Sequence, residues 1–105
     1  MLFIVTLNNR RSPDDIAAQQ TGHRDWLIAN TRAGRIVMAG PLEPRTGGLI
    51  MAHCVDRAEL DLMMADDPFV IHELVDVQVQ CVAAALRHEA FPARWAADAK
   101  AVSDR

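Results

Sequence analysis

Several features that mark particular classes of protein are missing from this sequence. No apolar run approaches the roughly 18 residues of a membrane-spanning segment. Basic residues do not outnumber acidic ones, since 11 Lys and Arg stand against 14 Asp and Glu, and the formal net charge is −3. A chain with this charge is poorly suited to nucleic acid or an anionic membrane surface. We therefore expect no nucleic acid and no membrane as a partner.

Cofactor motifs and cysteine chemistry are equally sparse. The sequence has no Walker A motif, no Gly-rich dinucleotide loop and no G-x-S-x-G motif. His53 and His72 could join Asp67 in a metal site, but no HxH, HxxxH or HExxH spacing favours one. Cys54 and Cys81 match no metal or redox spacing. We expect no cofactor, no metal ligand and two reduced, buried cysteines.

The first residues lack the marks of an export signal. Met1–Val5 are apolar, but they carry no basic segment and no cleavage site, and they are typical of a strand. Together with the absence of a disulfide pattern, this predicts a cytoplasmic protein.

The length of 105 residues predicts one domain. Apolar, β-rich runs predict strands at 2–7, 36–39, 49–55 and 75–81. N-cap residues followed by Pro or Glu predict helices at 12–32 and 56–65 and a short helical turn at 67–72. The order βαββαβ is that of an α+β, ferredoxin-like fold with a four-stranded antiparallel sheet. We expect this fold to span residues 1–91 and residues 92–105 to form a C-terminal extension, with a helix that carries Trp95.

The first three strands are apolar on both faces, which is unusual for this architecture. Helices cover one face of such a sheet, and the other face normally meets water and is polar. By alternation, Leu2 and Ile4 lie on one face of the first strand, and Phe3, Val5 and Leu7 lie on the other. In the second strand, Ile36 and Met38 lie opposite Val37 and Ala39. In the third strand, Leu49 and Met51 lie opposite Ile50 and Ala52. A second copy of the chain is the simplest cover. We therefore predict a homodimer with its sheets packed face to face, and leave open whether dimers assemble further.

His23 is the first candidate for chemistry. It shares a helix face with Ile16, Gln20 and Leu27, and this face should point toward the sheet. A half-buried histidine needs partners for its ring nitrogens. One interpretation is a core histidine bonded to a backbone carbonyl, and the other is a catalytic residue with a carboxylate partner.

Asp67 is the partner that we favour. Because Pro68 follows it, Asp67 is also expected to cap the short helix, and the two roles are compatible. Asp66 competes for the role, but it is not adjacent to the proline. A His–Asp pair makes a usable general base, since the carboxylate fixes the tautomer and stabilises the imidazolium.

Four further residues are candidates for substrate contact. Gly40 and Pro41 end an apolar strand. They either only terminate the strand, or they form part of a binding site in which a ligand approaches the backbone because glycine has no side chain. Arg45, beside two glycines, is either solvated or able to bind a carboxylate or other oxyanion bidentately. Phe69 follows Asp67 and Pro68, and we expect it at the same pocket.

These segments together resemble the YciI-like, or YCII-related, proteins of the dimeric α+β barrel superfamily. The resemblance covers about residues 1–91 and rests on Gly22-His23-Arg24-Asp25-Trp26-Leu27, Ala39-Gly40-Pro41, Pro44-Arg45-Thr46-Gly47-Gly48 and Asp67-Pro68-Phe69. It implies a ferredoxin-like protomer that dimerises through its sheet face. It also implies an active-site His–Asp pair, which falls on His23 and Asp67.

Two classes of function remain open at this point. The first is a small cofactor-independent enzyme that performs acid–base chemistry of the lyase, isomerase or dehalogenase type on a small cyclic or aromatic-derived metabolite. The second is a dimeric module that binds a small ligand, or serves only a structural role, without catalysis.

Overall fold

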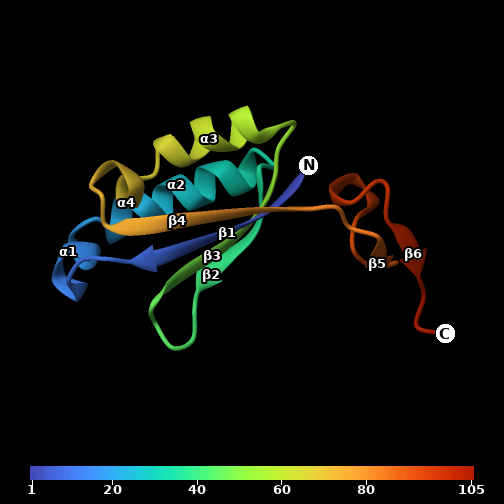
Figure 1. Ribbon diagram of the computed structural model, residues 1–105, viewed down its shortest axis with the longest axis horizontal. Helices are drawn as coiled ribbons and strands as arrows, with labels where there is room; N and C mark the ends of the chain where they lie inside the picture. Colours follow the sequence, from blue (N-terminus) through green and yellow to red (C-terminus); the bar gives the residue numbers. More distant parts are fainter.

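The computed structural model describes all residues, 1–105, and its main body is a sheet covered by helices (Figure 1). The elements are, in chain order, β1 (Leu2–Asn9), α1 (Pro13–Ala18), α2 (Gln20–Arg32), β2 (Ile36–Pro41), β3 (Gly47–His53), α3 (Arg57–Ala65), α4 (Pro68–Ile71), β4 (Val75–Val82), β5 (Leu86–His88), η1 (Ala93–Trp95) and β6 (Lys100–Val102). No helix is both long enough and apolar enough to span a bilayer.

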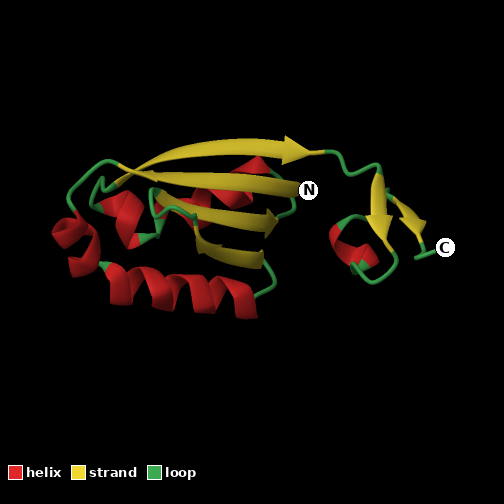
Figure 2. Cartoon of the chain, turned by 90° about the horizontal axis from the view of Figure 1, so that it is seen from below, coloured by secondary structure: helices red, strands yellow, loops and turns green.

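The first four strands form one antiparallel sheet in the order β2-β3-β1-β4. The four helices lie on one face of this sheet and leave the opposite face without a covering layer (Figures 1 and 2). The predicted α+β, ferredoxin-like fold with a four-stranded antiparallel sheet is therefore confirmed.

The core lies between the sheet and the helices. Fourteen buried residues form one apolar cluster, in which Phe3, Val5, Ile50 and Leu60 are at most 1% exposed. Burying a side chain of this size contributes about 1.5–3 kcal/mol. The cluster therefore fixes the sheet face against α2, α3 and α4, of which α2 and α4 carry the candidate site.

A bulge in β2 corrects one part of the predicted strand pattern. Simple alternation places Ile36 and Met38 on the same face, but the register shifts between them. Ile36 pairs with Ala52 and is buried in the core, whereas Met38 pairs with Met51 and is 47% exposed on the opposite face. The extra residue of the bulge shifts the alternation of side chains, so residues after it point to the opposite face from the one that simple alternation predicts.

Helix ends follow the predicted caps, with one break that the sequence did not indicate. Ser12 Oγ accepts a hydrogen bond from the Asp15 N–H at 3.2 Å, as predicted for the first helix start. The single helix expected over 12–32 is instead divided at Gln19 into α1 and α2. The Gln19 N–H donates to the Ile16 carbonyl three residues back, at 3.1 Å. Such a tightened turn ends the first helical segment.

The hairpin between β2 and β3 is longer than predicted on both sides. β2 continues to Pro41, β3 begins at Gly47, and the Leu42 N–H donates to the Gly47 carbonyl at 2.9 Å. A Cβ atom on Gly47 would lie 1.8 Å from the Leu7 carbonyl oxygen, so no other residue fits there without a backbone shift. Glycine thus brings the hairpin close to β1, where both form one wall of a cavity.

The C-terminal extension is not the helix that we predicted from its alanine content. It contains only the single 3₁₀ turn η1 and the strand β6, which pairs in parallel with β5. Trp95 contacts Phe91 edge-on, with ring centroids 5.7 Å apart, and the Arg94 guanidinium lies over its ring. The Ala96 backbone, at φ −149° and ψ 59°, lies outside the helical region, so the helix ends after one turn. The domain boundary at Phe91 stays a prediction, although β5 precedes it and pairs with β6 beyond it.

Candidate active site

His23 and Asp67 form a buried pair, although 44 residues separate them in the chain. The His23 Nδ1 atom lies 2.7 Å from Asp67 Oδ1, and the two side chains are 9% and 0% exposed. The same Oδ1 atom accepts a hydrogen bond from the Phe69 N–H at 3.0 Å, which makes Asp67 the N-cap of α4. Both roles considered for Asp67, helix cap and histidine partner, are present together in the geometry.

A glycine allows the two elements that carry the pair to approach each other. Gly22 precedes His23 on α2, and a Cβ atom there would lie 3.2 Å from the Cγ atom of Pro68 at the start of α4. That separation is tighter than ordinary van der Waals contact, so a larger residue would push α4 away. The close contact of α2 with α4 places the imidazole within hydrogen-bonding distance of the carboxylate.

Two aromatic side chains hold the plane of the imidazole. The Phe69 ring stacks on His23 with centroids 3.8 Å apart and planes 5° from parallel. Trp26 lies one turn further along α2, with centroids 5.8 Å apart, and its Nε1–H donates to the Met63 carbonyl at 3.0 Å. The histidine therefore has little freedom to rotate away from Asp67.

This geometry distinguishes the two ring nitrogens of His23. With Asp67 ionised, Nδ1–H donates to its carboxylate, and the lone pair of the neutral ring is left on Nε2. Nε2 makes no hydrogen bond within the chain and is not among the buried polar atoms that lack a partner. His23 lines a cavity that Asp67 does not reach, so the edge of the ring that carries Nε2 faces this space. The arrangement can accept a proton from a bound molecule.

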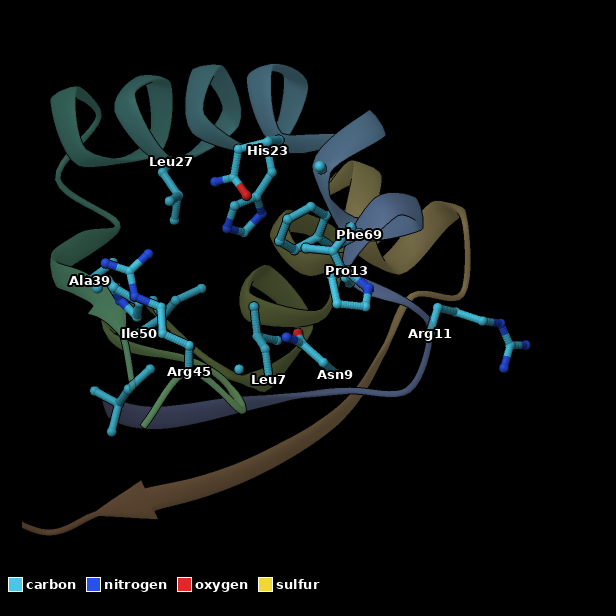
Figure 3. A pocket seen from close by; sticks show the side chains of 18 residues that line it. Leu7, Asn9, Arg11, Pro13, His23, Leu27, Ala39, Arg45, Ile50 and Phe69 are labelled. Carbon is cyan, nitrogen blue, oxygen red and sulfur yellow. The ribbon is translucent and has the colours of Figure 1, made fainter. Parts of the chain in front are cut away.

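The cavity has a volume of about 620 Å³ and lies between α1, α2, the ends of β1 and β2, and the β2–β3 hairpin (Figure 3). Such a volume lies within the range of about 300–1,000 Å³ typical of small-molecule sites. All four residues that we expected to contact substrate line it: Gly40, Pro41, Arg45 and Phe69. A Cβ atom on Gly40 would meet nothing within 4 Å, so this glycine leaves open space.

Sequence reasoning missed part of the lining. Asn9 and Arg11, at the end of β1 and before α1, line the cavity, as do Leu7 and Ile50 on the sheet. The position of Arg11 directly before the capping residue Ser12 was the one available signal, because a strand end and a helix start meet there.

The remaining histidines and cysteines lie outside this site. His53 lies on β3, away from the cavity, and its pKa is lowered mainly by burial. Burial also raises the pKa of the Cys54 thiol to about 11, with a further contribution from Glu59. Cys81 is exposed, which corrects the expectation that both cysteines are buried, because it lies on the edge strand β4.

A second His–Asp pair, which we did not predict, lies in the extension. His88 Nε2 is 2.5 Å from Asp104 Oδ1, and both side chains are exposed. No group of three or more His, Cys, Asp or Glu side chains in the structure could hold a metal ion. The expectation of no metal ligand and no cofactor stays a prediction.

Comparison with solved structures shows the same fold in an enzyme. The 5-chloro-2-hydroxyhydroquinone dehydrochlorinase (TftG) of Burkholderia phenoliruptrix AC1100, solved in complex with 2,5-dihydroxybenzoquinone, superposes with a TM-score of 0.69. The match covers 84% of this chain and 95% of the dehydrochlorinase at 18% sequence identity, so the similarity is one of fold. No curated protein sequence matches the chain. The profile of the YCII-related domain matches residues 1–80, and the chain belongs to this family.

Proposed function

We propose that this protein is a small, cofactor-independent enzyme that performs proton-transfer chemistry on a small cyclic or aromatic-derived metabolite. One observation carries the proposal: Nδ1 of His23 is held by a buried carboxylate while Nε2 faces an open cavity. His23 is the general base, Asp67 orients it and stabilises the imidazolium, and Gly40, Pro41, Arg45 and Phe69 contact the substrate. The reaction class is lyase, isomerase or dehalogenase.

A dehalogenation illustrates how the pair would work. The related fold of a dehydrochlorinase supports this class, since that enzyme eliminates chloride from a hydroxylated ring. In an elimination of HCl, Nε2 takes a proton from the substrate, and the electron pair of the broken bond forms a new π bond. Chloride leaves with the electrons of the carbon–chlorine bond, and the imidazolium later returns the proton to water. No oxidant or reductant is needed.

The test is turnover by the wild type and by a matched pair of variants. With 5-chloro-2-hydroxyhydroquinone and a panel of related cyclic substrates, chloride release or a spectral change reports the reaction. His23→Gln should reduce turnover about 10²–10⁴-fold, which is the usual contribution of a general base. His88→Gln, at the other His–Asp pair, should leave it unchanged. Retained activity in folded His23→Gln contradicts the role.

The alternative is a module that binds a small ligand, or only supports a dimer, without catalysis. The capping bond of Asp67 to the Phe69 N–H favours this reading, because it gives the carboxylate a structural task of its own. This alternative predicts a saturable ligand that is recovered unchanged after long incubation with the wild type.

We further propose a homodimer formed through the uncovered sheet face, in the cytoplasm. That face carries the apolar side chains Leu2, Ile4, Met38, Leu49 and Met51. A contiguous apolar face of this kind usually marks an interaction surface. Sedimentation of the full chain should give a dimer, and Met51→Lys should weaken it. Leu62→Lys, on the exposed side of α3, is the matched control. A wild-type monomer at micromolar concentration contradicts the proposal.

A further inference from the structure

The cavity at His23 differs in charge from the rest of the chain. The whole sequence is acidic, with a net charge of −3. None of the 18 residues that line the cavity is Asp or Glu, whereas Arg11 and Arg45 both line it. Asp67 is fully buried behind His23 and does not belong to the lining. The cavity is therefore a locally positive space in an acidic protein, which favours an anionic ligand.

Arg45 is the cation best placed to contact such a ligand. It lies in the β2–β3 hairpin, and Figure 3 shows its side chain extending from the hairpin toward α2, the helix that carries His23. Its one ionic partner is Glu43 at 3.7 Å, and the two side chains are 76% and 77% exposed. An exposed ion pair contributes little, because water screens it and its side chains lose freedom. The guanidinium can therefore exchange Glu43 for ligand oxygens at small cost.

Arg11 makes a different contribution. In Figure 3 its side chain points away from the cavity at the far end from Arg45. Its Nη1–H donates only to the adjacent Arg10 carbonyl, at 3.3 Å, and no carboxylate pairs with it. Arg11 therefore attracts an anion through the electrostatic field at the entrance without direct contact, and this effect weakens with salt.

The other walls define the rest of the ligand. Apolar side chains from sheet and helices line most of the space: Leu7, Ile16, Leu27, Ile50 and Phe69. The cavity thus combines an apolar body with a cation on one side and a proton acceptor on another. We infer that it binds a ring carboxylate, with the carboxylate on Arg45 and the ring under Nε2 of His23. This deepens the proposed function and rests on it for the role of His23, but the binding claim stands on the arginines.

The experiment is a calorimetric titration of the full-length protein with benzoate and with its neutral isostere benzamide. Benzoate should bind the wild type more tightly. Arg45→Gln should weaken benzoate about tenfold, the effect of losing one charge-assisted contact, and leave benzamide unchanged. Glu43→Gln removes the competing carboxylate and should strengthen benzoate. Arg24→Gln, on α2 outside the cavity, is the control and should change neither ligand.

Each outcome decides for or against the inference. Equal binding of benzoate and benzamide, no binding of either, or unchanged benzoate affinity in Arg45→Gln overturns it. Arg45 is exposed, so its variant should fold, and circular dichroism checks this. His23→Gln should retain the preference for benzoate, because this variant removes only the proton acceptor. If the preference holds but no substrate is turned over, the charge assignment stands and the proposed catalysis fails.

Discussion

The chain contains two His–Asp pairs with similar nitrogen–oxygen distances but very different surroundings. The His23–Asp67 distance is 2.7 Å and the His88–Asp104 distance is 2.5 Å, yet the first pair is 9% and 0% exposed and the second 49% and 83%. An exposed pair gains little because water screens it and its side chains lose freedom. Distance alone therefore does not identify a site, and burial beside a cavity separates the two.

The pairs also differ in what their second ring nitrogen does. In the extension, the Ala90 N–H donates to His88 Nδ1 at 3.0 Å, and Nε2 is the atom that meets Asp104. Both nitrogens of His88 are thus occupied within the chain. His23 keeps Nε2 free of any protein partner and directs this edge toward the cavity. A reactive histidine needs one nitrogen held and the other available, and only the pair in the body meets this condition.

Removing the carboxylate of each pair should give the largest difference in stability between the two pairs. We expect Asp67→Ala to lower the free energy of unfolding by about 2–3 kcal/mol, because it removes the α4 cap and leaves a buried histidine without its partner. Asp104→Ala should change it by less than about 0.5 kcal/mol, as for other surface positions. Urea denaturation followed by circular dichroism measures both. Equal effects would mean that burial does not distinguish the pairs.

Removing an aromatic neighbour tests whether stacking contributes to the difference. Phe69→Leu deletes the ring that lies 3.8 Å from His23 and should cost about 1–2 kcal/mol of stability, from lost packing and stacking. It should also lower turnover without abolishing it, since the Asp67 bond remains. Phe91→Leu, in the extension, is the matched variant and should leave turnover unchanged. A Phe69→Leu protein with full activity would show that stacking has no part in positioning His23.

The two cysteines provide a smaller test of the same contrast. The pKa of Cys54 is raised to about 11 mainly by burial, whereas Cys81 is exposed. A thiol reagent at mildly alkaline pH should label Cys81 rapidly and Cys54 only after unfolding, as read by mass spectrometry. Because the unfolded thiol loses its proton first, Cys54 should lower stability as pH rises from about 9 to about 11. Rapid labelling of both in the folded protein contradicts the assigned burial.

Local signals in the sequence predicted much of the fold. The caps at Ser12 and Asp67 depend on residues close in the chain, and both are present in the structure. β4 also forms as predicted, but its burial does not follow the alternation, because Val77 and Cys81 on the apolar side are exposed at the edge of the sheet. The bulge after Ile36 and the division of the first helix at Gln19 could not be predicted, because neither leaves a distinct local pattern. The alanine-rich extension gives no local sign of its strand either, since β6 forms by pairing with β5, more than ten residues earlier in the chain.

The candidate site was predictable only in part. Asp67 was expected as both cap and partner, and the YCII-related resemblance joined it to His23 across 44 residues. The position of Arg11 at the cavity follows from the way β1 ends beside α1, and its one local signal is its place directly before the capping residue Ser12.

The most direct test is the tautomer of each histidine, read from long-range ¹H–¹⁵N correlations of the uniformly labelled protein at a pH where the rings are neutral. His→Gln variants assign the signals. We predict the Nδ1–H form for His23, with its Nδ1 proton shifted downfield by Asp67, and the Nε2–H form for His88. Opposite tautomers in one spectrum would support the assignment of His23 as a held base with a free nitrogen. A His23 ring protonated on Nε2 would contradict it.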